Sequence, residues 1–298
     1  MRILLFGKNG QVGWELQRAL APLAEVVALG SDSPAPLAAD FRRPEELSRT
    51  VHCVAPQVIV NAAAYTAVDE AQTHPVLAHT INAAAPGQLA RLAAAAGAWL
   101  VHYSSDQVFD GSGDVPWTED AATAALNVYG RSKLDGELAI RASGCRHLIL
   151  RSSWIHAARG DNFMRRILRL AAERDQLDVV ADQFGAPTGA ELLADVTAHV
   201  LRGVLADPAR GGTYHVAAAG QTHRQAYARH VVAFARAHGA ALRLQPDGVR
   251  PICSSEHRAA APRPLNSRLD TRKLRATFEL VLPDWQSGVE RTLRELLG

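Results

Sequence analysis

The sequence predicts an α/β fold built on a doubly wound parallel sheet, with a smaller, loop-rich C-terminal region. In the first half, short apolar segments alternate with helical ones along the chain. The apolar segments are continuous rather than interrupted by polar residues, which is typical of parallel strands covered on both faces. After about Ser153 the alternation loosens and polar residues become more frequent.

The predicted elements of the first half follow one another as strands, turns and helices. The run Ile-Leu-Leu-Phe at residues 3–6 predicts a buried strand, and a glycine-rich turn leads from it into a helix at 11–20. An alanine-rich run at 80–96 predicts a helix that stops at the following glycine. A later helix carries Tyr129 and Lys133. The other predicted strands are 25–29, 58–60, 99–104 and 147–150.

The second half has fewer clear strands. The segment 251–266 is rich in proline and polar residues, which predicts a long loop. We see no internal repeats and no low-complexity tail. The predicted helices are 162–174, 189–205 and 225–238, and the predicted strand is 212–216.

These patterns predict two regions. Residues 1–155 form the regular α/β domain, and we expect 190–217 to return to it. Residues 156–189 and 218–298 form the smaller region, which we expect to hold a substrate.

Composition excludes several classes of protein. Of 298 residues, 48% are hydrophobic and 21% are charged, and the net charge of +2 favours neither nucleic acid nor an anionic membrane as a partner. No signal peptide and no membrane-spanning stretch are expected. The three cysteines are too few and too widely spaced for a disulfide framework, so we expect reduced thiols and a cytoplasmic protein.

A glycine-rich turn at residues 7–13 follows the first predicted strand and reads Gly-Lys-Asn-Gly-Gln-Val-Gly. Glycines at this position let backbone N–H groups approach a pyrophosphate, which the start of the next helix also attracts. We therefore expect a dinucleotide site there, with a plain turn as the alternative. The acid that usually holds an adenosine ribose is missing or displaced to Asp32, which favours NADPH over NADH.

Tyr129 and Lys133 are four residues apart, so on a helix they share a face. The chain has only three lysines and otherwise uses arginine. A tyrosine beside a lysine suits proton donation, because a nearby cation lowers the pKa of a phenol. The alternative is a surface aromatic–cation pair.

Two strand ends supply further candidates. Ser105 and Asp106 end one predicted strand, at the sheet edge where such folds bind ligands. Ser105 with Tyr129 and Lys133 makes a Ser–Tyr–Lys set, and the alternative for this serine is a strand-end cap. Residues 61–66, Asn-Ala-Ala-Ala-Tyr-Thr, end another strand with small residues against which a flat ring could lie; helix–strand packing is the alternative.

Together these motifs resemble an extended short-chain dehydrogenase/reductase, and within that superfamily the dTDP-4-dehydrorhamnose reductase family. The matching segments are Leu-Phe-Gly-Lys at 5–8, residues 60–69, Leu-Asn-Val-Tyr-Gly at 126–130, Arg-Ser-Ser-Trp at 151–154, Asp-Gln-Phe-Gly-Ala-Pro-Thr at 182–188 and Arg-Pro-Leu-Asn-Ser at 263–267. They span nearly the whole chain. The resemblance implies a Rossmann domain and reduction of a dTDP-linked 4-keto sugar by NADPH or NADH. This step ends the synthesis of dTDP-L-rhamnose, a donor for lipopolysaccharide O-antigen.

The resemblance also implies roles for individual residues. Tyr129 would protonate the developing alkoxide, Lys133 would hold the nicotinamide ribose, and Ser105 would hydrogen-bond the carbonyl oxygen. The residues of the cofactor site would be Tyr129 and Lys133, together with Gly7, Gly10, Gln11, Val12, Asp40, Phe41, Ala62, Ala63, Ala64, Tyr65, Thr66 and Tyr103. The sugar nucleotide would meet Val68, Asp106 and Trp154 besides Ser105 and Tyr129. A buried core aromatic is the alternative for Trp154, and a helix or turn cap for Asp40.

The chain departs from the family pattern in places. Gln107 and His156 stand where the family commonly has tyrosine, and Ala125 where a proline is frequent. These differences concern sugar specificity rather than reaction type. Some relatives form a magnesium-linked homodimer, and Glu15, Glu191 and Glu295 match the glutamates involved. Solvated surface charge is the alternative for all three.

Two other functions stay open from sequence. The first is a sugar-nucleotide epimerase, reductase or dehydratase on the same scaffold, although Asp106 and Gln107 offer only one carboxylate for dehydration. The second is a non-catalytic NADP-binding regulatory subunit. The Ser–Tyr–Lys set argues against that, because a subunit that only binds nucleotide needs no proton donor.

Overall fold

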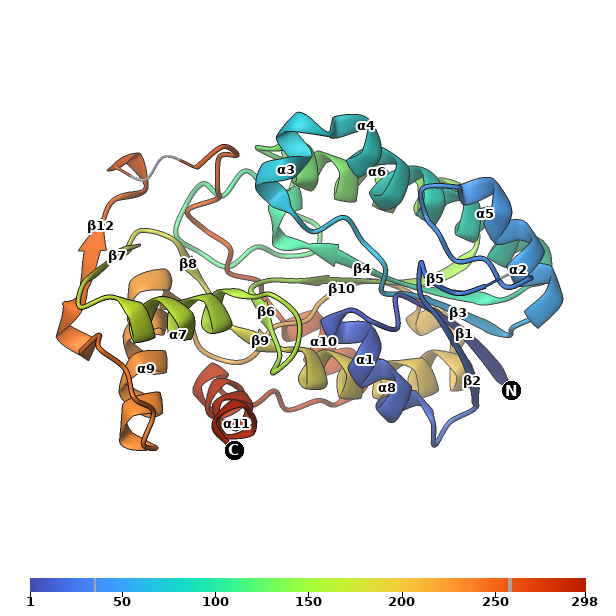
Figure 1. Cartoon of the computed structure of the whole chain (residues 1–298). Helices are drawn as coiled ribbons and strands as arrows, with labels where there is room; N and C mark the ends of the chain where they lie inside the picture. The colour runs from blue at the N-terminus through green and yellow to red at the C-terminus, as the bar shows by residue number, and fades with distance from the viewer. Residues whose placement is uncertain (35, 257–258) are drawn as a thin grey trace.

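A six-stranded sheet forms the centre of the computed structural model, which describes residues 1–34, 36–256 and 259–298 (Figure 1). The strand order is β10-β5-β4-β3-β1-β2, and every neighbouring pair is parallel. The doubly wound α/β prediction is therefore confirmed. The strands are β1 (Arg2–Phe6), β2 (Glu25–Leu29), β3 (Val58–Asn61), β4 (Trp99–Ser105), β5 (Arg146–Ser152) and β10 (Gly212–His215).

Helices cover both faces of the sheet, because successive strand residues point to opposite sides. Leu4 and Ile59 pack against α2 (Leu47–Val54), α5 (Ala85–Ala96) and α6 (Val128–Ala142) on one face. Leu5 and Val60 pack against α1 (Gln11–Leu20) and α8 (Ala190–Ala206) on the other. Each fully buried leucine or isoleucine contributes about 1.5–3 kcal/mol, so this double core holds the sheet edge in place.

Several predicted elements coincide with observed ones. The helix predicted at 11–20 and the strand predicted at 25–29 have those bounds in the structure. The helix predicted at 80–96 begins with a π-helical turn, Thr80–Ala84, and continues as α5. Gly97 ends it with a φ of 63°, a left-handed conformation that glycine adopts without steric cost.

The C-terminal region has a core of its own, formed by α7 (Phe163–Glu173), α9 (Arg224–Ala237) and α11 (Trp285–Leu297). These helices pack with the parallel pair β7 (Leu177–Val180) and β12 (Val249–Ile252). This region lies beside one end of the sheet in Figure 1, next to the carboxyl ends of its strands.

The prediction of one loop over 251–266 is wrong at its start, because β12 runs to Ile252 and a helical turn follows at Ser254–Glu256. Residues 257–258 of that segment lie outside the described part. Several elements went unpredicted. They are α3 (Val68–Thr73), α4 (Pro75–His79), α10 (Arg272–Phe278), β6 (Ile155–His156), β8 (Phe184–Gly185), β9 (Thr188–Gly189) and β11 (Thr222–His223), besides α2, α11, β7 and β12. No helix in the described ranges is long and apolar enough to cross a membrane.

Candidate active site

The glycine turn between β1 and α1 is a tightly packed piece of backbone. Gly7 has a φ of +90°, and a Cβ there would lie 2.6 Å from the backbone nitrogen of Ala63. A Cβ on Gly13 would lie 2.0 Å from the carbonyl oxygen of Gly7. The first turn of α1 carries no acidic residue. The start of this helix is therefore open to an anion such as a pyrophosphate.

Two cavities meet at the carboxyl edge of the sheet. The first, here called the glycine-turn cavity, has a volume of about 800 Å³ and runs from Gly7 to Tyr129. The second, here called the arginine cavity, has a volume of about 910 Å³ and lies toward α7 and α9. Residues that line both include Thr66, Val68, Asp106, Gln107, Trp154 and Arg224.

Nearly all the residues predicted for the cofactor line the glycine-turn cavity. They are Gly7, Gly10, Gln11, Val12, Asp40, Phe41, Ala62, Ala63, Ala64, Thr66, Tyr103, Tyr129 and Lys133. Tyr65 does not line it, because its hydroxyl donates to Glu70 at 3.3 Å and its backbone is held by Asn82.

Asp40 has both of the roles considered for it, as a cavity-lining residue and as a turn cap. It lines the cavity, and its carboxylate also accepts the backbone N–H of Arg42 at 3.0 Å, as a turn cap does. The Arg42 guanidinium donates to the same carboxylate at 2.7–2.9 Å. This hydrogen bond is the main reason that the pKa of Asp40 is lowered.

Ser105 and Tyr129 lie together at the inner end of this cavity. The Ser105 hydroxyl donates to Asp106 Oδ1 at 3.0 Å and accepts the backbone N–H of Gln107 at 3.1 Å. Burial raises the pKa of Tyr129 to about 12, while its hydrogen bond with Ser105 acts in the opposite direction. The phenol therefore keeps its proton at neutral pH, which is the form that a proton donor needs.

Lys133 is buried beside them on α6. Its Nζ donates to the carbonyl of Tyr103 at 2.5 Å and lies 3.5 Å from Nε2 of His102. Burial lowers the pKa of Lys133 to about 8, and the carboxylate of Glu137 partly offsets that effect. The expectation that Lys133 lowers the pKa of Tyr129 is wrong for this structure. Desolvation of the phenol dominates, and the ammonium is directed to the carbonyl of Tyr103.

Trp154, Val68 and Asp106, the residues predicted for the sugar nucleotide, all lie where the two cavities meet. Trp154 has a φ of 49°, a strained conformation that costs about 1–3 kcal/mol in a residue other than glycine. Its indole packs over Gly185, where a Cβ would be only 2.8 Å from the ring. Trp154 therefore borders the cavity and is no buried core aromatic.

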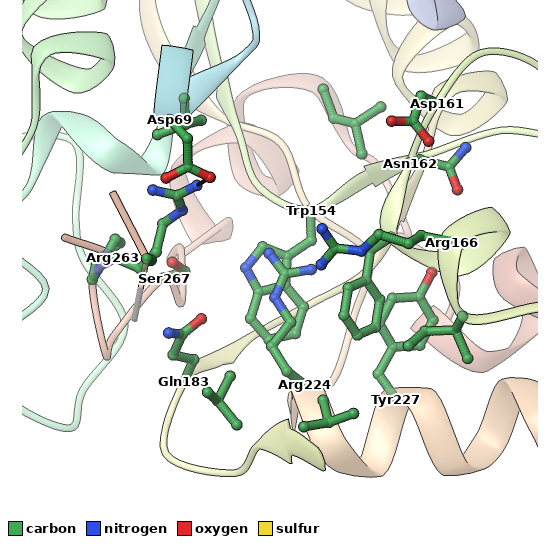
Figure 2. A pocket seen from close by; sticks show the side chains of 18 of the residues that line it. Asp69, Trp154, Asp161, Asn162, Arg166, Gln183, Arg224, Tyr227, Arg263 and Ser267 are labelled. Atoms are coloured by element: carbon green, nitrogen blue, oxygen red, sulfur yellow. Dashed lines mark hydrogen bonds and ion pairs between the residues drawn. The ribbon is translucent and has the colours of Figure 1, made fainter. Parts of the chain in front are cut away.

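Four arginines line the arginine cavity, namely Arg166, Arg174, Arg224 and Arg263. Figure 2 shows Arg166 and Arg224 beside Trp154, and Arg263 beside Asp69. Arg224 stacks on the indole at 3.8 Å, and Arg263 donates to Asp69 at 2.8 Å. Burial lowers the pKa of Arg224 to about 10, and the charges of Arg166 and Arg263 act in the same direction. The cluster therefore concentrates positive charge that an anionic ligand would neutralise.

Sequence analysis missed these arginines as a group. Arg263 entered it only within a matching segment, and Arg166 and Arg224 not at all. They come from α7, the start of α9 and a late loop, so no local spacing connects them. Arginine is frequent along the whole chain, so its occurrence in the sequence does not distinguish these residues from the other arginines.

The three glutamates predicted for magnesium do not assemble into a site. Burial raises the pKa of Glu191, and the charge of Glu15 contributes to that rise, while Glu15 also accepts from Arg18 at 3.3 Å. Glu295 lies on α11. Within residues 1–34, 36–256 and 259–298, no group of three His, Cys, Asp or Glu side chains could hold a metal ion. The residues of one chain thus do not fit magnesium.

Comparisons with known proteins cover the whole chain. A family model described as the RmlD substrate binding domain matches residues 1–297. A dTDP-4-dehydrorhamnose reductase from Escherichia coli K12 is 51% identical over 296 residues, covering 99% of this chain and 98% of the relative. A crystal structure of the Bacillus anthracis dTDP-4-dehydrorhamnose reductase in complex with NADP has a TM-score of 0.86 and 30% identity, covering 99% of both chains. A Clostridium acetobutylicum structure of the same name has a TM-score of 0.88 and 29% identity, covering 100% of both.

Proposed function

The chain belongs to the family of the RmlD substrate binding domain, and on that premise we propose that it reduces dTDP-4-dehydro-L-rhamnose to dTDP-L-rhamnose. The resemblance seen in the sequence motifs is thereby confirmed at the level of the family. The reaction would be the last step of dTDP-L-rhamnose synthesis. One observation carries the assignment to this site: Ser105, Tyr129 and Lys133 line a cavity that continues into one lined by four arginines.

The proposed chemistry uses side chains that already lie together. Reduced NADP, when bound, supplies the hydride for C4 of the keto sugar. Ser105 turns its O–H from Asp106 to the substrate carbonyl, where negative charge develops during reduction. Tyr129 gives its phenolic proton to the resulting alkoxide, and its raised pKa favours the protonated form before the reaction. Lys133 supplies a buried positive charge in the same cavity.

The arginine cavity suits the diphosphate of the substrate. Arg166, Arg224 and Arg263 offer forked N–H donors, which match phosphate oxygens. Two of them come from α7 and α9, which form part of the core of the C-terminal region. Trp154 would separate this diphosphate from the reacting sugar, since it lines both cavities.

We propose NADPH as the preferred cofactor, with NADH as the weaker one. Gly30 and Ser31 follow β2 in the glycine-turn cavity, and Asp32 is hydrogen-bonded to Asn9 at 3.2 Å. Arg42 also lines this end and offers a cation to a 2′-phosphate. We also propose that the protein forms a homodimer. We propose a cytoplasmic location as well, which is supported by the three free cysteines. Magnesium is left out, because the predicted glutamates form no metal-binding group in the described residues.

We also propose that the two regions divide the work. Residues 1–155 with 190–217 would bind the dinucleotide, and residues 156–189 with 218–298 would bind the sugar nucleotide. In support, α8 and β10 pack with the central sheet, while α7 and α9 carry Arg166 and Arg224.

The test is oxidation of NADPH, followed by absorbance, with enzymatically generated dTDP-4-dehydro-L-rhamnose. Wild-type protein should oxidise NADPH only when the sugar is present, and absence of such oxidation contradicts the proposed activity. A Tyr129→Phe variant should lose about 10²–10⁴-fold in kcat with little change in KM. If that variant keeps most of its turnover, Tyr129 is not the proton donor. An equal or higher kcat/KM with NADH contradicts the cofactor preference.

A further inference from the structure

Gln107 lies in the helical turn Asp106–Val108 that follows β4, and it lines both cavities. Its backbone is held closely. The N–H of Gln107 donates to Ser105 Oγ at 3.1 Å, and a Cβ on Gly130 would lie 2.1 Å from the carbonyl oxygen of Gln107. Gln107 therefore keeps a fixed place relative to Ser105, the residue that meets the carbonyl in the proposed function.

The orientation of the Gln107 side chain follows from its neighbours. Asn127 caps α6 by accepting the backbone N–H of Gly130 through Oδ1 at 2.8 Å. Its Nδ2 donates to the carbonyl of Pro262 at 2.9 Å and to Gln107 Oε1 at 2.8 Å. A backbone N–H must meet an oxygen and a carbonyl must meet an N–H, so the Asn127 amide has one orientation. Gln107 must then present its oxygen to Asn127.

The other end of the Gln107 amide is left for a ligand. With Oε1 held by Asn127, the end of the side chain that has no partner is Nε2, which carries two N–H donors. Nε2 has no hydrogen-bond partner in the described part of the chain. It is also not one of the fully buried polar atoms without a partner, so it is accessible from outside the protein. A residue that lines both cavities thus carries a donor pair without a partner in the described part of the chain.

Asp106, the preceding residue, offers the complementary group. Its carboxylate is buried and accepts from Ser105 at 3.0 Å, and a carboxylate oxygen can accept a further hydrogen bond. A hydroxyl group donates one hydrogen bond and accepts others. A donor and an acceptor on adjacent residues are therefore suited to recognise one hydroxyl group.

We propose that Gln107, together with Asp106, recognises the sugar hydroxyl on the carbon next to the reduced carbonyl. This inference rests on the proposed function, which places that carbonyl at Ser105. Gln107 donates a hydrogen bond from Nε2 to the hydroxyl oxygen, and the Asp106 carboxylate accepts a hydrogen bond from the hydroxyl group. Where the resembling family commonly has tyrosine, this chain has an amide whose Nε2 is the end without a partner, so Gln107 acts as a specificity-determining residue for a sugar that carries this hydroxyl.

The test measures binding of dTDP-L-rhamnose and of its 3-deoxy analogue to the NADP-loaded protein by titration calorimetry. Gln107→Met keeps the length of the side chain but removes its donors. We expect it to weaken dTDP-L-rhamnose about tenfold and to leave the affinity for the 3-deoxy analogue within about threefold. Gln107→Glu keeps an acceptor for Asn127 but loses the donors, so it should show the same selective loss. Gln88→Met is the matched control, because Gln88 is also half-buried and hydrogen-bonded but lines neither cavity.

Equal losses for the two ligands, or no loss for either, would overturn the proposal. If Gln107→Met alone weakens binding while Gln107→Glu does not, the Asn127 contact matters and the donor role is refuted. The calorimetric test measures binding and not activity. A wild-type protein without reductase activity would therefore contradict the proposed function, while the binding data would still decide the role of Gln107.

Discussion

The glycine-turn cavity and the arginine cavity are of similar size but are built in opposite ways. Backbone and small side chains at the ends of β1 and β3 shape the first, where Gly7 and Gly13 allow close approach. Long charged side chains from separate segments shape the second, with Arg166, Arg224 and Arg263 facing one space. The difference shows that a site made of backbone is complete once the sheet forms, whereas a site made of cations is completed by its anionic ligand.

The two cavities also differ in their electrostatic cost. Guanidinium groups in one cavity repel one another, and burial of Arg224 adds to that cost. A bound diphosphate would offset both terms. In the glycine-turn cavity the charged groups are fewer, and the most buried cation, Lys133, already donates to the carbonyl of Tyr103. Substitutions at residues that line only one cavity should therefore affect one ligand at a time.

The largest effect should come from Arg224→Met. Loss of charge-assisted hydrogen bonds costs about 1.5–3 kcal/mol, so the affinity for dTDP-L-rhamnose should fall about 10–100-fold. NADPH affinity should fall by less in a parallel titration, because Arg224 lies at the junction of the cavities and the change leaves the glycine turn intact. Arg229→Met on the same helix is the control, because Arg229 is exposed and lines neither cavity. A comparable loss for both ligands would mean that the cavities are not independent.

Gly13→Ala should have the converse effect on the other cavity. Its Cβ would meet the Gly7 carbonyl at 2.0 Å, so the backbone must move. Such overpacking costs about 1–3 kcal/mol, and we expect a lower Tm and weaker NADPH binding. Gly10→Ala is the matched control for Tm, because its Cβ would lie at an ordinary 3.4 Å from the same oxygen. Similar Tm values for the two variants would disprove the steric argument.

A pH profile should report the charge of the buried lysine. Burial lowers the pKa of Lys133 to about 8, so its ammonium is present below that pH and is lost above it. The kcat/KM for NADPH, which reports the free enzyme, should therefore fall by up to about tenfold per pH unit above about 8. Tyr129, with a pKa raised to about 12, keeps its proton over that range. A flat profile from pH 7 to 9.5 would show that the charge on Lys133 is not required.

The smallest effect should come from Asp69→Asn. Asp69 pairs with Arg263 at 2.8 Å, but its side chain is 51% exposed. Ion pairs of this kind contribute about 0–1 kcal/mol, so KM for the sugar nucleotide should rise by no more than about fivefold as Arg263 loses an anchor. A rise beyond about tenfold in steady-state kinetics would indicate that Asp69 itself contacts the substrate.

Sequence reasoning succeeded where a site depends on residues close together in the chain. The turn at 7–13 and the i, i+4 pair Tyr129 and Lys133 are local patterns, and the structure places both on the glycine-turn cavity. Local patterns could not give side-chain direction. Tyr65 belongs to a matching segment, yet its hydroxyl turns to Glu70.

The amino-acid sequence by itself determined the doubly wound sheet, the turn at its first strand and the family of the chain, because these follow from periodicity, glycine geometry and contiguous motifs. Tertiary structure alone decided the rest. It brought Arg166, Arg224 and Arg263 from three segments to one cavity and turned the Gln107 amide through its contact with Asn127. It also raised the pKa of Tyr129 where the sequence argument expected a lower one. The physical reason is that burial, like-charge proximity and amide orientation depend on neighbours in space, and these lie far apart in the chain.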